Sequence, residues 1–75
     1  MKLRDYIRSL DRQGLADYAA RVPTTVGFLQ VHVVSARKPS SLRFMRALAK
    51  ATEGQVGLIE VLLHYGVPEE ELRAA

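Results

Sequence analysis

Residues 15–34, LADYAARVPTTVGFLQVHVV, decide the fold. The apolar side chains from Leu15 to Val22 follow the i, i+3, i+4, i+7 spacing of one helix face. Pro23 ends this helix because proline lacks a backbone N–H and disfavours helical backbone in the residue before it. Ala19 is small where a second helix must cross closely. The stretch predicts two short helices joined by a tight turn at residues 22–24, a helix-turn-helix.

The second helix of this pair has an ambiguous local signal. Thr24 or Thr25 can cap its start with a side-chain hydroxyl. Residues 28–34 are rich in valine, however, and β-branched residues favour strands. A strand over 28–34 is therefore the alternative. We expect a helix, because tertiary packing commonly overrides propensity over so short a segment.

The remaining chain predicts further amphipathic helices around this pair. A first helix covers residues 3–10, and the leading helix of the pair runs from 14 to 21 after a cap at Asp11. A fourth helix over 41–52, with Leu42 on its inner face, stops at Gly54, and a fifth over 55–65 stops at Gly66. Residues 68–71 read as a final helical turn. Residues 1–75 are thus expected to form a single all-α, compact five-helix domain.

Composition excludes several classes of protein. The 75 residues leave room for one core, and the absence of cysteine excludes disulfides and thiolate metal sites. The two histidines, His32 and His64, are far apart, so we expect no metal and no cofactor. No apolar run approaches the ~18 residues needed to span a membrane. The charged N-terminus does not resemble a signal peptide, so we expect a cytoplasmic protein.

Charge is unevenly distributed along the chain. Ten of the eleven Lys and Arg residues lie in residues 1–50, with only three of the eight acids. The remaining 25 residues carry one arginine and five glutamates. A basic first two-thirds followed by an acidic end predicts one surface that meets a polyanion.

Five segments together resemble a known family. They are LRDYIRSL near the start, GLADYAARV, TTVGFL, RKPSS and MRALAKATEGQV. In order and spacing, these segments resemble the Cro-like, YdaS-type helix-turn-helix regulators of phages and prophages, over about residues 3–57. The resemblance implies a fold like that of lambda repressor and Cro. It also implies sequence-specific binding of a double-stranded DNA operator by a small transcriptional repressor in the bacterial cytoplasm, which acts by occlusion.

In that family geometry the third helix lies in the major groove, where each base pair presents a distinct pattern of donors, acceptors and methyl groups. Gln30 is the first candidate for reading a base, since an amide can bond bidentately to adenine. Val26, Val31 and Val34 could meet thymine methyl groups, although Val31 and Val34 could contact protein instead. We expect Phe28 to be a wedge, either in the core or against the sugar–phosphate edge, and not to stack on a base. The candidate DNA-facing residues of this helix are Thr25, Val26, Gly27, Phe28, Gln30, Val31 and Val34.

Phosphate contacts are expected from residues flanking this helix. Arg37 and Lys38 follow it directly. Arg12 and Gln13 precede the leading helix of the pair, residues 14–21, whose N-terminal amides would also face the DNA. Arg43 can add to this cluster. Binding should then weaken steeply with salt, because each engaged cation releases counterions.

The fifth helix has more apolar residues than one core-facing stripe needs. A surplus apolar face suggests a partner surface, and regulators of this kind bind as two-fold dimers. Residues 58–75 are therefore expected to supply a homodimer contact, through Leu58, Val61, Leu62 and Tyr65. The alternative is that this helix is central and buried on both sides.

Catalytic function is not expected. The carboxylates are scattered, no serine has a histidine and an acid placed around it, and there is no glycine-rich phosphate loop. We therefore predict neither an enzyme nor a small-molecule substrate. The alternative function is a helical protein-interaction module, such as an antitoxin or an adaptor to a host protein. The valine-rich third helix favours that reading, whereas the basic cluster favours DNA.

Overall fold

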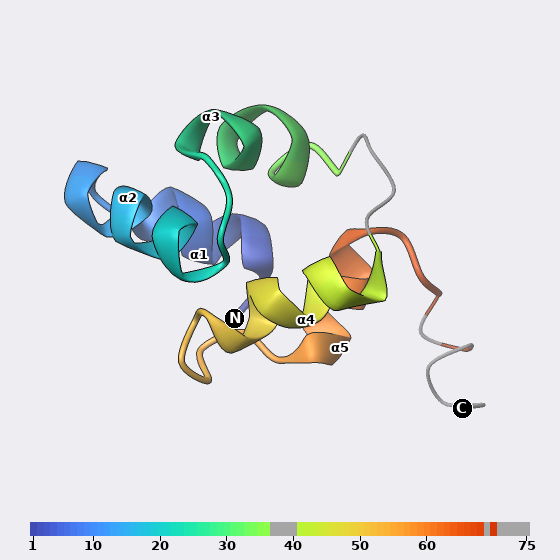
Figure 1. Cartoon of the computed structure of the whole chain (residues 1–75). Coiled ribbons are helices and arrows are strands. Elements are labelled where there is room, and N and C mark those ends of the chain that lie inside the picture. The colour runs from blue at the N-terminus through green and yellow to red at the C-terminus, as the bar shows by residue number, and fades with distance from the viewer. Residues whose placement is uncertain (37–40, 69, 71–75) are drawn as a thin grey trace.

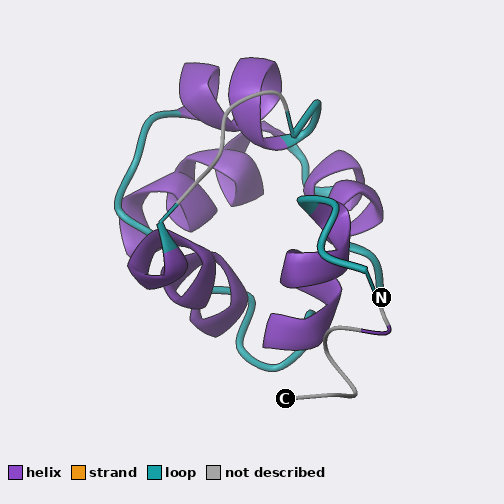
Figure 2. Ribbon diagram, turned by 90° about the vertical axis from the view of Figure 1, so that its right-hand side faces the viewer, coloured by secondary structure: helices purple, strands orange, loops and turns teal. Residues whose placement is uncertain are grey.

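The computed structural model describes residues 1–36, 41–68 and Glu70, and their regular secondary structure is entirely helical (Figure 2). In chain order the elements are α1 Leu3–Ser9, α2 Arg12–Arg21, α3 Val26–Phe28, η1 Leu29–Val33, α4 Leu42–Lys50 and α5 Leu58–His64. The π-helical segment η1 continues α3, so the two form one helical stretch, hereafter α3–η1 (Figure 1). The all-α prediction is confirmed, and the strand considered for residues 28–34 is wrong.

Side-chain caps set the first residues of three helices. The Gly14 amide donates to the Asp11 carboxylate over 2.7 Å, so α2 begins at Arg12, two residues earlier than expected. Thr25 accepts from the Phe28 amide at 3.0 Å and starts α3. Ser41 accepts from the Phe44 amide at 3.1 Å and starts α4. Each cap satisfies an amide that the first helical turn leaves without a backbone partner.

The segment between α4 and α5 is a turn held by a buried threonine. Thr52 is 1% exposed, donates to the Ala49 carbonyl at 2.7 Å and accepts from the Val56 amide at 3.0 Å. Gly54 has the positive φ, +92°, that a left-handed helix stop requires. Because Thr52 holds Val56 in this turn, α5 begins at Leu58 and not at residue 55 as predicted.

The core lies where α5 packs against α4 and α1, with α2 closing it from the other side (Figures 1 and 2). Its fully buried side chains come from α1, α2, η1, α4, α5 and the turn before α5, and Leu48 is the one that α4 supplies. Leu42 was predicted on the inner face of α4 but is 50% exposed, since it is the first residue of α4 and lies outside the packed turns. The buried apolar residues are Leu3, Tyr6, Ile7, Leu15, Tyr18, Ala19, Val22, Leu29, Val33, Leu48, Ala51, Val56 and Val61.

Two side chains of α2 bind the C-terminal end of α4. The Tyr18 hydroxyl donates to the Leu48 carbonyl at 2.8 Å, and the Arg21 Nε donates to the Ala51 carbonyl at 3.1 Å. Carbonyls in the last turn of a helix lack intrahelical partners, so these bonds satisfy groups that would otherwise be costly to bury. Burial raises the pKa of Tyr18 well above its ordinary value, and the nearby Tyr6 and Tyr65 add to the shift.

Within the described residues, no helix has the length and apolar character needed to cross a membrane.

Candidate nucleic-acid interface

α3–η1 has one anchored side and one open side. Leu29 and Val33, four residues apart, are fully buried and fix the segment to the core. Gly27, Gln30 and Val31 are exposed on the other side, and Val31 keeps 57% of its surface accessible. These are three of the residues predicted to face DNA, and the structure places them together on the outside of the helix.

A surface hollow joins this open side to the start of α2. It is lined by Leu10, Asp11, Arg12, Leu15, Ala16, Val26 and Gln30. Arg12 from the first turn of α2 therefore shares one concave surface with Gln30 and Val26 of α3–η1. A cation beside an exposed amide and an apolar side chain is the combination that phosphate and base contacts together require.

The start of α2 differs in two ways from the expected phosphate site. The Gly14 amide is already bonded to Asp11, so it is not free to bind a phosphate. The Gln13 side chain donates to Asp17 at 2.9 Å along the exposed surface of α2. The prediction of free N-terminal amides is therefore wrong at Gly14. Arg12 is exposed, so this end of α2 keeps an accessible cation.

Phe28 and Val34 are half-buried and pack against the core. The Phe28 ring lies 5.0 Å from the His32 ring and meets Phe44 edge-on at 5.7 Å. Phe28 is thus a wedge in the core, and its contact with Phe44 joins α3–η1 to α4. We therefore correct the assignment of Phe28 and Val34 to the DNA-facing residues, because both side chains pack against the core. Thr25 is exposed, with its hydroxyl oxygen engaged as the helix cap.

The predicted basic cluster is only partly described. Arg37 and Lys38 lie outside the described residues, as do residues 69 and 71 of the turn predicted at 68–71. Arg43 and Arg46 are exposed on α4, the helix that Phe44 connects to α3–η1.

The predicted dimer surface on α5 needs correction. Val61 is fully buried in the core, because it faces α4 and α1, so its assignment to a partner contact is wrong. Leu58, Leu62 and Tyr65 are half-buried. The apolar side chains that α5 exposes are Ile59 and Leu63, with 60% and 37% of their surfaces accessible.

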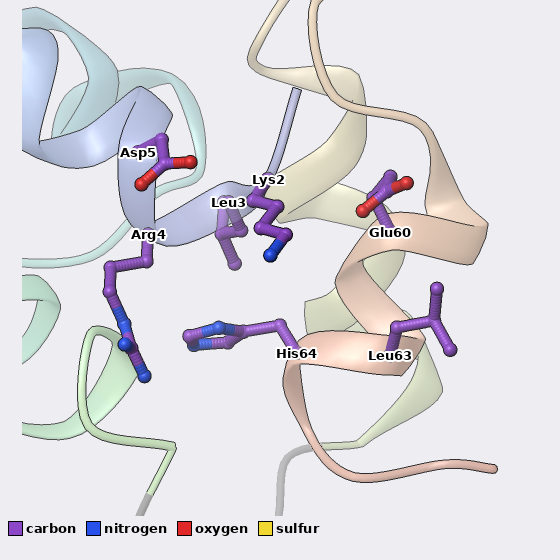
Figure 3. A pocket seen from close by; sticks show the side chains of 7 residues that line it. All are labelled: Lys2, Leu3, Arg4, Asp5, Glu60, Leu63 and His64. Atoms are coloured by element: carbon purple, nitrogen blue, oxygen red, sulfur yellow. The ribbon is translucent and has the colours of Figure 1, made fainter.

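A second hollow lies between α1 and α5 and is lined by Lys2, Leu3, Arg4, Asp5, Glu60, Leu63 and His64 (Figure 3). His64 extends from α5 across this hollow, and its Nε2 lies 2.5 Å from the Val33 carbonyl at the end of η1. A carbonyl can only accept, so Nε2 carries the proton. His64 is half-buried. Its partner is 31 residues away, so no local pattern signals this contact.

The other chemistry of the site is limited. Among the described residues, no group of three or more His, Asp or Glu side chains is placed to hold a metal ion. His32 has a buried Nδ1 with no hydrogen-bond partner among these residues, consistent with its packing against Phe28. Comparison with family models, curated proteins and solved structures gives no match for this chain.

Proposed function

We propose that the chain binds double-stranded DNA sequence-specifically, with α2 and α3–η1 as a helix-turn-helix and α3–η1 in the major groove. The main observation is the hollow shared by Arg12, Val26 and Gln30, because it brings a cation that can bind phosphate beside Gln30, the side chain proposed to read a base. Val26 is half-buried and packs against the core, so it lines the hollow without being assigned a base contact. As a small repressor of phage or prophage type, acting in the cytoplasm, the protein would occlude a promoter by occupying its operator.

Each exposed side chain has a defined part in this proposal. Gln30 bonds an adenine edge, and Val31 packs on a thymine methyl group. Arg12 binds the phosphate flanking that base pair and sets the register of the helix. Arg37, Lys38 and Arg43 add phosphate contacts, consistent with the basic composition of residues 1–50.

The test is selection of bound duplexes from a random pool at moderate salt. We expect an enriched inverted repeat with half-sites about one helical turn, roughly 10 base pairs, apart. Arg12→Glu should then weaken binding to every duplex and lower the salt dependence, because one phosphate contact is lost. A pool that shows no enrichment would contradict the proposal.

The inverted repeat implies a homodimer, for which Ile59 and Leu63 are the exposed contact candidates on α5. Replacing both with serine should leave the fold intact, since both side chains are accessible, but should shift sedimentation at micromolar concentration from dimer to monomer. A wild-type protein that sediments as a monomer at high micromolar concentration would contradict the dimer.

One observation favours the alternative function of a protein-interaction module. Val31 is 57% exposed, and an accessible β-branched apolar side chain suits a protein contact as well as a thymine methyl. Arg37→Glu combined with Lys38→Glu separates the two. The double variant should abolish DNA binding but hardly change an apolar protein interface.

A further inference from the structure

The glycines of this chain have identifiable structural reasons, with one exception. Gly54 and Gly66 adopt positive φ values of +92° and +88°. A Cβ at Gly14 would lie 3.0 Å from the Asp11 carboxylate that caps α2. Gly57 is the N-cap residue of α5, a position that favours glycine over alanine. Gly27 has none of these reasons. It lies in the helical backbone of α3, is exposed, and would place a Cβ with no atom within 4 Å.

None of the residues that the structure describes therefore benefits from the missing side chain at residue 27. Glycine in a helix is unfavourable relative to alanine, because it loses more backbone freedom on folding. α3–η1 is short and valine-rich, so it has little helix propensity to spare. An exposed glycine there lowers stability, and no intramolecular contact of the described residues offsets this loss. We therefore look for its reason in a molecule that contacts the helix from outside.

The position of Gly27 indicates what that is. Gln30 and Val31 follow three and four residues later and are exposed on the same open side of the helix. Gly27 thus leaves bare backbone beside the two side chains assigned to base contacts. Glycine commonly serves where backbone must approach a ligand closely.

We propose that Gly27 is the point of closest approach between α3–η1 and the DNA, where base edges contact the helix backbone directly. This inference rests on the proposed DNA-binding function. A methyl group at residue 27 would hold the helix away from the groove floor. The bond from Gln30 would then lengthen, and hydrogen bonds weaken steeply as their geometry is lost. Gly27 is in this sense a specificity-determining residue, although it has no side chain.

The test compares Gly27→Ala with Gly57→Ala. Both replace an exposed glycine whose Cβ would meet no atom within 4 Å, but Gly57 lies at the start of α5, outside the proposed interface. The protein and both variants are titrated with the duplex selected from the random pool and with an unrelated duplex, and their thermal unfolding is recorded.

Gly27→Ala should weaken binding to the selected duplex about tenfold or more, the size of one lost base contact. Its binding to the unrelated duplex should stay the same, because that affinity comes from phosphate charges which the substitution does not touch. Its unfolding midpoint should be equal to or above that of the wild type. Gly57→Ala should bind both duplexes as the wild type does.

Two results would overturn the inference while leaving the proposed function in place. One is unchanged affinity of Gly27→Ala for the selected duplex, and the other is a lower unfolding midpoint, which would give the glycine a structural reason. A wild-type protein without preference for any duplex would instead refute the proposed function, and the role of Gly27 with it.

Discussion

α2 and α3–η1 adjoin in the chain, and both begin at a side-chain cap, yet they use their surfaces differently. α2 buries Tyr18 and Ala19 and bonds to the end of α4, so its contacts connect distant parts of the chain. α3–η1 is held by two fully buried side chains and leaves Gln30 and Val31 accessible. α2 therefore stabilises the domain, whereas α3–η1 is anchored by two side chains and keeps its other side exposed to solvent.

The anchoring of α3–η1 gives the largest expected effect. Leu29→Ala removes a fully buried side chain and should lower the free energy of unfolding by about 2–5 kcal/mol. Val31→Ala, two residues away on the open side, should change it by less than about 0.5 kcal/mol. Urea unfolding followed by circular dichroism measures both. Equal effects of the two substitutions would mean that the segment has no anchored side.

The open side is tested by Gln30→Ala. Loss of a base contact should weaken binding to the selected duplex by about 1–3 kcal/mol and relax the preference at one base pair, without changing stability. Fluorescence anisotropy with duplexes altered one position at a time measures this. A uniform loss across all duplexes would show that Gln30 contacts the phosphate backbone and reads no base.

The stabilising role of α2 is tested by Tyr18→Phe. This variant leaves the Leu48 carbonyl without its hydroxyl donor and should lower the free energy of unfolding by about 1–3 kcal/mol at neutral pH. Duplex affinity should not change, because Tyr18 lies in the core. A loss of affinity in a folded variant would contradict the division of roles between the two helices.

The same residue predicts a pH dependence. Burial raises the pKa of Tyr18 in the folded state, so its contribution to stability is complete below the ordinary tyrosine pKa of about 10 and is lost as the pH rises above it. Raising the pH above about 10 should therefore lower the free energy of unfolding of the wild type more than that of Tyr18→Phe, as measured by chemical denaturation at each pH. Parallel curves for the two proteins would contradict the raised pKa.

The caps provide the smallest effects and a matched pair. Asp11→Ala removes the cap of α2, and Thr25→Ala removes the cap of α3, each at a cost of about 1 kcal/mol. Asp11→Ala should also strengthen DNA binding slightly, because it removes a carboxylate from the hollow beside Arg12 and frees the Gly14 amide. Weaker binding by this variant would place the DNA away from the start of α2.

Local sequence rules predicted the elements whose signals are local. The apolar spacing over residues 15–22, Pro23, and the caps at Asp11 and Thr25 located both helices of the pair. Gly66 located the end of α5, whereas α4 ends at Lys50, before Gly54 and the predicted end at residue 52. The start of α5 was misplaced because the bond between Thr52 and Val56 keeps residues 55–57 in a turn, although Gly57 stands directly before the helix.

Contacts between distant residues were the ones that sequence could not provide. Val61 was assigned to a partner although it is core, because a helix with apolar residues on several sides does not reveal which side packs inward. His64 meets the end of η1 through the tertiary fold alone. For the candidate site, the geometry implied by the resemblance predicted that Gln30, Val31 and Gly27 face outward. That Arg12 and Gln30 lie close together could not be predicted, because it depends on how α2 and α3–η1 pack against each other.

The π-helical turn at Leu29–Val33 makes one part of this chain tolerant to a change in length. A π-turn holds about one residue more than an α-turn, so deleting Val31 would let residues 26–33 close into ordinary α-helix with the flanking residues still in register. In α2, deletion of one residue would rotate everything beyond it by about 100° and carry Tyr18 or Ala19 out of the core. The helix proposed to read DNA is thus the one whose length can vary while the scaffold stays fixed.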